Sequence, residues 1–290
     1  MDTLRYVFAG NRFFVLEEML KLGLDISNIF ACKNSYLEKE LIKRNIDFNL
    51  IDDKKSFIND LYNLDYDILI SNGLPIKLPI SRLTKNNTKK FINIHPSYLP
   101  DLRGSDPVPG AILFGRNSGA TCHFMDDSLD TGDIISRVLI KNEDNFDVDF
   151  LYQLSFEAEK KVFLVSYKRN FEVSEKQAEK GNEIYYTFKD EDLILKLNET
   201  PLEIKRRVKA FNNSSKLAYF YIKKEKIIVY DIELFNSNEF DCLFQEKEDL
   251  TILMKYKNFV FFKKNGYFIK MKIDSEKMSF FTIGDILNID

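Results

Sequence analysis

The first 170 residues alternate between short apolar runs and helical patterns, and this alternation restricts the fold more than any other feature. The run LRYVFAG precedes the amphipathic NRFFVLEEMLKLG, and NIFACK precedes SYLEKELIKRN. FNLID, KKSFINDLYNL, DYDILISNG and KKFINIHPS continue the series. Strands that alternate with helices of roughly ten residues form a mainly parallel, open sheet covered on both faces. The pattern predicts a Rossmann-like α/β domain that binds its ligands at the carboxyl ends of the strands.

A different pattern begins after the long amphipathic stretch FDVDFLYQLSFEAEKKVFLVSYKRN and the polar SEKQAEKGNE. One more helix, TPLEIKRRVKAF, is followed by short apolar runs such as KIIVYDIELF and NFVFFKK, which are typical of strands. A chain of 290 residues is long enough for two domains with separate cores. We therefore expect an α/β domain at 1–185 and a smaller, mostly β domain at 186–290.

Composition and charge disfavour several classes of partner. The net charge of −3 and the pI near 5.7 give no general attraction to nucleic acid. Apolar stretches stay shorter than about 18 residues, so neither a membrane span nor an export signal is expected. Cys32, Cys122 and Cys242 are scattered, which indicates no disulfide framework, no metal site and a reducing, cytoplasmic location.

One of only two histidines lies in the segment FINIHPS, at 91–97. Because side chains alternate along a strand, Asn93 and His95 share one face, and Pro96 places them at the strand's end. An amide and an imidazole that point at one oxygen would form an oxyanion site. The alternative is that both side chains only cap backbone groups at the end of the strand.

A carboxylate follows in SLDTGDII, where Asp130 lies in a glycine-containing turn between two predicted strands. Beside His95, it could keep the imidazole protonated and pass protons through a water molecule. Spacing alone favours the alternative, that Asp130 is an ordinary turn residue.

These segments resemble one known enzyme family. The order N-x-H-P-S-x-L-P-x-x-R-G-x-x-P, then S-G-A-T, then M-D-x-x-L-D-T-G resembles the formyltransferases that use 10-formyltetrahydrofolate. The resemblance is strong over 1–180, is weaker in the following segment, and is closest to the nucleotide-sugar N-formyltransferases. It implies that Asn93, His95 and Asp130 are catalytic, that 10-formyltetrahydrofolate is the co-substrate, and that 1–185 is the catalytic domain.

The resemblance also implies further site residues. The family's pterin slot is formed largely by backbone groups, and the matching positions are Ile76, Lys77, Leu78, Met125 and Asp126. Arg103 matches an arginine beside the site. His123, in the middle of the predicted strand ATCHFM, is interpreted as a structural or pocket-wall residue.

The acceptor amine is predicted less directly. Asn11 and Arg12 follow the first strand, where a helix N-terminus could meet a phosphate; Arg12 is equally explained as an exposed residue. We expect a nucleotide-linked amino dideoxysugar, with a dTDP-linked 3- or 4-amino sugar favoured, as in bacterial surface polysaccharide and O-antigen synthesis. The alternative is a methionyl-tRNA formyltransferase, which usually needs a basic second domain. A homodimer is also expected, and FVFF at 259–262 would form either its interface or the core of the second domain.

Overall fold

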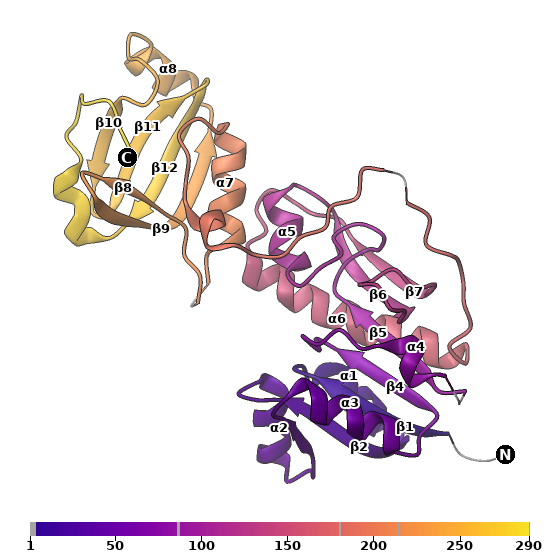
Figure 1. Cartoon of the computed structure of the whole chain (residues 1–290). Coiled ribbons are helices and arrows are strands. Elements are labelled where there is room, and N and C mark those ends of the chain that lie inside the picture. Colours follow the sequence, from indigo (N-terminus) through magenta and orange to yellow (C-terminus); the bar gives the residue numbers. More distant parts are fainter. Residues whose placement is uncertain (1–3, 86–87, 180, 214, 290) are drawn as a thin grey trace. The chain divides into compact units, whose positions relative to one another are not determined.

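The computed structural model describes residues 4–85, 88–179, 181–213 and 215–289 (Figure 1). The chain divides into two compact units that interleave along the sequence. The first comprises Met1–Pro107, Asn117–Lys141 and Gln153–Tyr186, and the second comprises Val108–Arg116, Asn142–Tyr152 and Thr187–Asp290. The expected boundary between residues 185 and 186 therefore stays a prediction.

Within the described residues, the first unit is built on a seven-stranded sheet with the order β3-β2-β1-β4-β5-β6-β7. Its strands are β1 (Arg5–Gly10), β2 (Asp25–Cys32), β3 (Asn49–Ile51), β4 (Ile68–Asn72), β5 (Lys90–His95), β6 (Ser118–Phe124) and β7 (Ile134–Ile140). The strands from β3 to β5 pair in parallel, whereas β6 is antiparallel to both of its neighbours. The predicted Rossmann-like, mainly parallel sheet is confirmed.

Two separate apolar clusters cover the two faces of this sheet. The helices up to residue 168 are α1 (Phe14–Lys21), α2 (Tyr36–Arg44), α3 (Lys54–Asn63), α4 (Ile80–Leu83), α5 (Pro107–Leu113) and α6 (Val148–Lys168). Nearly all of α5 and the first turn of α6 group with the second unit. One cluster joins Ile92 and Ile94 of β5 to residues of α1, α2 and α6, and the other joins Phe91 to residues of α3 and α4. Because side chains alternate along β5, Asn93 and His95 face the α3 and α4 side.

The second unit contains, among the described residues, a five-stranded antiparallel sheet with the order β10-β11-β12-β9-β8, drawn from orange to yellow in Figure 1. Its strands are β8 (Tyr219–Ile222), β9 (Glu225–Phe235), β10 (Ile252–Tyr256), β11 (Phe259–Lys264) and β12 (Tyr267–Ile273), accompanied by α7 (Pro201–Ala210) and α8 (Asn238–Phe244). Val260, Phe261 and Phe262 are buried within the single chain, which supports the core interpretation of FVFF. The predicted small, mostly β domain is confirmed as a fold.

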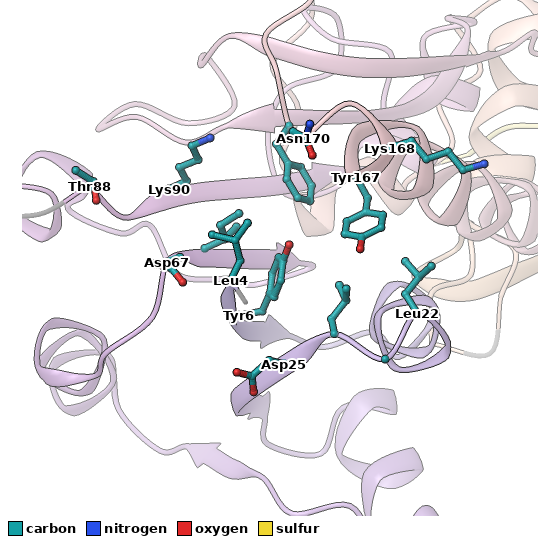
Figure 2. Close-up of a pocket in the computed structure, with 14 residues that line it drawn as sticks. Leu4, Tyr6, Leu22, Asp25, Asp67, Thr88, Lys90, Tyr167, Lys168 and Asn170 are labelled. Atoms are coloured by element: carbon teal, nitrogen blue, oxygen red, sulfur yellow. The ribbon is translucent and has the colours of Figure 1, made fainter. Parts of the chain in front are cut away.

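A cavity of about 800 Å³ opens at the amino edge of the first sheet (Figure 2). Tyr6 near the start of β1, Asp67 just before β4, Lys90 at the start of β5 and Tyr167 near the end of α6 line it. His95 lies at the opposite end of β5, and none of the predicted site residues lines this cavity. No helix in the described part of the chain is long and apolar enough to cross a membrane.

Candidate active site

The three residues predicted to be catalytic lie together at the carboxyl edge of the first sheet. Asn93 and His95 come from the end of β5, and Asp130 comes from the connection between β6 and β7. His95 and Asp130 are buried, with 5% and 7% of their surfaces exposed. Asp130 has a φ of +56°, a left-handed conformation that asparagine and aspartate adopt more readily than most other residues.

The side-chain nitrogen atoms around this carboxylate converge on one of its two oxygens, Oδ1 of Asp130. Asn93 Nδ2 donates a hydrogen bond to it at 3.3 Å, and His95 Nδ1 lies 3.6 Å away. The predicted oxyanion site concerns an oxygen of the substrate, and it stays a prediction; in the structure both nitrogen atoms lie beside Asp130 Oδ1. An oxyanion stabilised by the same two groups would have to form beside this carboxylate.

The hydrogen-bond partners of His95 determine its tautomer. Nε2 lies 2.9 Å from the carbonyl oxygen of Leu102, and because a carbonyl oxygen only accepts, Nε2 carries a hydrogen. Nδ1, on the Asp130 side, is therefore the ring nitrogen that can gain or lose a proton. Protonation of Nδ1 would place a second N–H opposite the carboxylate.

Burial and charge act in opposite directions on these groups. Burial lowers the pKa of His95, and the nearby carboxylate of Asp130 only partly offsets this effect. The pKa of His95 is therefore lowered overall, which favours the neutral imidazole; the expectation that Asp130 keeps it protonated stays a prediction. Burial opposes ionisation of Asp130, but His95, His123 and the Gly104 N–H together hold the pKa of Asp130 well below its usual range.

The loop after β5 supplies two backbone groups to the site. The Leu102 carbonyl oxygen accepts a hydrogen bond from His95 Nε2, and the Gly104 N–H donates a hydrogen bond to Asp130 Oδ2 at 3.2 Å. Both residues have positive φ, +58° and +114°. A Cβ on Gly104 would lie 2.2 Å from the carbonyl oxygen of Tyr186, so this position needs glycine for space as well as for conformation.

Sequence reasoning missed the position of His123, which belongs to the same cluster. His123 pairs directly with Asn93 across β5 and β6, and its Nε2 lies 3.3 Å from Asn93 Nδ2 and 3.6 Å from Asp130 Oδ1. Its Nδ1 donates to the Phe124 carbonyl at 2.7 Å, so Nε2 of the neutral ring is an acceptor. Nothing in the sequence alone specified this antiparallel register.

The segments predicted to form the cofactor slot lie on the α3 and α4 side of the sheet. Ile76 and Met125 both pack against the apolar cluster on that side, where Leu78 is buried. The side chain of Asp126 accepts from Thr131 Oγ1 at 2.7 Å, which shapes the loop that leads to Asp130. Lys77 is exposed.

A contact from Asp127 connects these two segments. Its carboxylate accepts a hydrogen bond from the Ser81 N–H at 3.1 Å, at the start of α4. The structure thus brings the two predicted slot segments together on the face that carries Asn93 and His95. Their predicted role in binding a cofactor remains a prediction.

Asn11 and Arg12, the predicted phosphate ligands, lie between the ends of β1 and β4 and the start of α1. Arg12 Nη1 forms an ion pair with Glu159 of α6, whose side chain is completely buried. Burial raises the pKa of Glu159, and Arg12 opposes that rise. Glu159 is a partner that sequence reasoning missed, and it shows that Arg12 is not simply an exposed residue at the start of a helix.

Arg103, the third predicted substrate residue, is held by side chains of the segment that follows α6. Its guanidinium donates from Nη2 to Gln177 Oε1 at 2.9 Å and also binds Glu179. Arg103 immediately precedes Gly104, whose N–H binds Asp130. Among the residues that the structure describes, no group of three His, Cys, Asp or Glu side chains could hold a metal ion.

Comparison with known families and relatives agrees with this geometry. Residues 58–166, which include Asn93, His95 and Asp130, match the family described as formyl transferase. Curated relatives include the methionyl-tRNA formyltransferase of Clostridium tetani, 30% identical over 60% of this chain and 56% of the relative. The methionyl-tRNA formyltransferase of Syntrophomonas wolfei is 31% identical over 56% of this chain and 52% of its own length. The chain thus matches just over half the length of these relatives.

Solved structures share the fold over more of the chain. An N-formyltransferase from Helicobacter canadensis, in complex with folinic acid and dTDP-3-aminofucose, has a TM-score of 0.71 at 19% identity, covering 93% of this chain and 99% of that chain. WlaRD, a sugar 3N-formyl transferase solved in the presence of dTDP and 5-N-formyl-THF, has a TM-score of 0.71 at 20% identity, covering 94% and 98%. A 4-N formyltransferase from Francisella tularensis has a TM-score of 0.67 at 21% identity, covering 79% and 97%. At these identities the likeness shows the shared fold.

Proposed function

Residues 58–166 belong to the formyl transferase family, and from this premise we propose that the chain is a sugar N-formyltransferase. The reaction moves the formyl group of 10-formyltetrahydrofolate to the amine of a nucleotide-linked amino dideoxysugar. The observation that carries the proposal is the convergence of Asn93, His95 and Asp130 at the carboxyl edge of the sheet. The solved relatives complexed with a formylated folate and with dTDP or a dTDP-sugar support this choice of substrates.

The geometry supports a mechanism in which one proton moves along the cluster. The neutral amine attacks the formyl carbon and gives a tetrahedral intermediate whose oxyanion accepts a hydrogen bond from Asn93 Nδ2; His95 Nδ1 donates to this oxyanion once it has received a proton. Asp130, which is ionised, accepts the proton that the amine loses and passes it to His95 Nδ1. When the bond between the formyl carbon and N10 breaks, that proton goes to N10, so tetrahydrofolate leaves and the three side chains regain their starting states.

The dTDP-linked 3- or 4-amino sugar, the O-antigen setting, the homodimer and the cytoplasmic location all belong to this proposal. Light scattering of the purified protein tests the dimer, for which a molar mass of twice 34.1 kDa is expected. A mass equal to that of one chain would remove the dimer without affecting the proposed chemistry.

A second candidate function is formylation of methionyl-tRNA, which the curated relatives perform according to their names. The net charge of −3 argues against it, because tRNA binding depends on neutralising phosphates. The two candidates share the mechanism and differ only in the acceptor.

The deciding experiment is a transfer assay with 10-formyltetrahydrofolate and a panel of acceptors. The panel contains dTDP-, UDP- and GDP-linked 3- and 4-amino sugars together with methionyl-tRNA, and release of tetrahydrofolate is measured. Turnover with one sugar would establish the proposal and name the acceptor. Turnover with methionyl-tRNA alone would establish the second candidate, and no turnover with any acceptor would contradict both.

The same assay tests the role of His95. We expect His95→Asn to lower kcat by about a thousandfold, because one donor to the oxyanion and the proton carrier are lost together. Folate affinity, measured by fluorescence titration, should change less than about threefold, because the proposed slot is formed by other segments. If the variant keeps substantial turnover, the oxyanion and proton-transfer roles assigned to His95 are wrong.

A further inference from the structure

The proposed mechanism assigns no role to Gln177, although its side-chain amide forms three hydrogen bonds beside the site. Nε2 donates to the carbonyl oxygen of Asp130 at 2.9 Å and to that of Gly132 at 2.8 Å. Oε1 accepts from Arg103 Nη2 at 2.9 Å. Both amide hydrogens and the amide oxygen are therefore bound to groups in the two loops that form the site.

Gln177 belongs to an extended segment after α6, the strap, which we define as residues 174–179. The Ser174 N–H donates to the Ile134 carbonyl at 2.8 Å, and Glu175 bridges Ile134 at the start of β7. Glu175 also forms an ion pair with Arg137 of β7. The strap is thus fixed along β7, and Gln177 extends from it toward the Asp130 turn.

The loop after β5 is bound by the residues that follow the strap. The Ile184 N–H donates to Asp101 Oδ1 and the Tyr186 N–H donates to the Arg103 carbonyl, both at 2.8 Å. This loop carries the Leu102 carbonyl that holds His95 and the Gly104 N–H that holds Asp130. The same part of the chain therefore holds both loops on which His95 and Asp130 depend.

The conformation of Asp130 explains why such a contact is needed. Asp130 has a φ of +56°, a left-handed conformation that is strained for a residue with a Cβ. Its carboxylate must nevertheless lie between His95 and His123, at 3.6 Å from each. Two hydrogen bonds to the carbonyls of Asp130 and Gly132 fix both ends of this turn.

We propose that Gln177 is a positioning residue for the formyl-transfer reaction, which fixes the turn carrying Asp130 and, through Arg103, the loop carrying Leu102 and Gly104. This inference rests on the proposed function. It adds a residue outside the predicted set, in a segment that the sequence presented only as a polar stretch. Gln177 acts through Asp130 and is not required to touch substrate.

The variants separate the two contacts of Gln177. Gln177→Met keeps the length of the side chain and removes every hydrogen bond. Gln177→Glu keeps an acceptor for Arg103 and removes the two hydrogen bonds to the carbonyls. Gln177→Asn retains the amide on a shorter side chain and replaces Gln177→Met if that variant does not fold. Gln153→Glu is the matched control, because Gln153 is exposed on α6.

In the transfer assay we expect Gln177→Met and Gln177→Glu each to lower kcat by about a hundredfold. The reason is that displacement of a reacting group such as Asp130 by about 1 Å can lower the rate by that factor. Folate affinity and the midpoint of thermal unfolding should remain close to those of the wild type and of Gln153→Glu. If Gln177→Glu keeps full activity, the contact with Arg103 is sufficient and the proposed fixing of the Asp130 turn is overturned. If both variants keep kcat within about threefold, the inference is overturned as a whole.

A second readout does not depend on turnover. The chain has only two histidines, His95 and His123, and both lie beside Asp130. The charged groups that act on His95 are Asp130, which raises its pKa, and His123 and Arg12, which lower it. Loosening Asp130 in Gln177→Met should therefore move the NMR titration midpoint of His95 to lower pH, by about half a unit or more.

The two readouts distinguish failure of the inference from failure of the proposed function. If the wild type transfers formyl to no acceptor, the NMR comparison still decides whether Gln177 positions Asp130. A His95 midpoint that is the same in the wild type, Gln177→Met and Gln153→Glu would overturn the inference whatever the reaction is. A midpoint that moves to lower pH in Gln177→Met and is unchanged in Gln153→Glu supports the inference, whereas a midpoint that moves to higher pH contradicts it.

Discussion

At the residue scale, the site contains buried ionisable groups, and burial shifts the pKa of each group so that its neutral form is favoured. His95 is buried between Asp130 and the Leu102 carbonyl, and this burial lowers its pKa. Glu159 is buried beside Arg12, and burial raises its pKa. Each group is therefore shifted toward its neutral form, and the partner partly offsets the shift. Ionisable groups whose pKa values are shifted by burial and by a specific charged partner are common at catalytic sites.

The lowered pKa of His95 predicts how stability depends on pH. In the unfolded chain a histidine takes up a proton near pH 6.5, whereas His95 in the folded chain does so only at lower pH. Between these two values the unfolded state binds more protons, so the free energy of unfolding should fall as the pH falls below 6.5. His95→Asn should show a weaker decrease between pH 7.5 and pH 5.5.

Urea unfolding of both proteins at several pH values measures this difference. Glu159 acts in the opposite direction, because its raised pKa favours the folded state at low pH, but it is present in both proteins and does not alter the comparison. Equal pH dependence in the two proteins would contradict the lowered pKa of His95.

At the element scale, the strand and helix pattern was predictable because it depends on local periodicity. The end of β5 was predictable for the same reason, since Pro96 follows the alternating Ile92, Asn93, Ile94 and His95. Helix α8 was not predicted, although Ser237 caps it by accepting from the Phe240 N–H.

The missed site residues share a different cause. His123 reaches Asn93 through the antiparallel register of β5 and β6, which are joined by a long connection. Gln177 and Glu159 reach the site through packing between segments that are distant in sequence. Local periodicity does not specify such pairings, so they could not be predicted from one sequence.

Gly132 offers a test of the turn between β6 and β7. A Cβ at Gly132 would lie 1.9 Å from the Phe124 carbonyl oxygen, so the backbone must shift to admit it. We expect Gly132→Ala to lower the free energy of unfolding by about 2 kcal/mol and to displace Asp130. Denaturant unfolding measures the first effect, and the NMR midpoint of His95 measures the second.

Gly23→Ala is a suitable comparison for that variant. Gly23 has a φ of +64° and no atom within 4 Å of an added Cβ, so only backbone strain of about 1 kcal/mol is expected. It lies at the end of α1, away from Asp130, and should leave His95 unchanged. If Gly132→Ala is as stable as the wild type, the close approach to Phe124 is not a constraint.

At the scale of the whole molecule, the two units are not consecutive along the chain, although their folds were predictable. Val108–Arg116 and Asn142–Tyr152 group with the second unit. Within that unit Gly115 lies close to Arg206 of α7, because a Cβ at Gly115 would be 2.5 Å from the Arg206 guanidinium carbon. The periodicity of the sequence marks where strands and helices change, and it does not show which segments pack together.

This interleaving predicts that a chain ending at residue 185 is not an independent folding unit. Val108, Ala111 and Ile112 of α5 are buried, and deletion of residues 186–290 would remove the longest segment of their unit, Thr187–Asp290. Exposure of these side chains should lower the midpoint of thermal unfolding and broaden the transition, because buried apolar side chains contribute about 1.5–3 kcal/mol each. Circular dichroism melting of residues 1–185 beside the full chain measures both effects. A sharp transition at the same midpoint would instead establish that residues 1–185 fold as an independent domain, as predicted. Residues 108–116 would then be stably packed without contacts from residues 186–290.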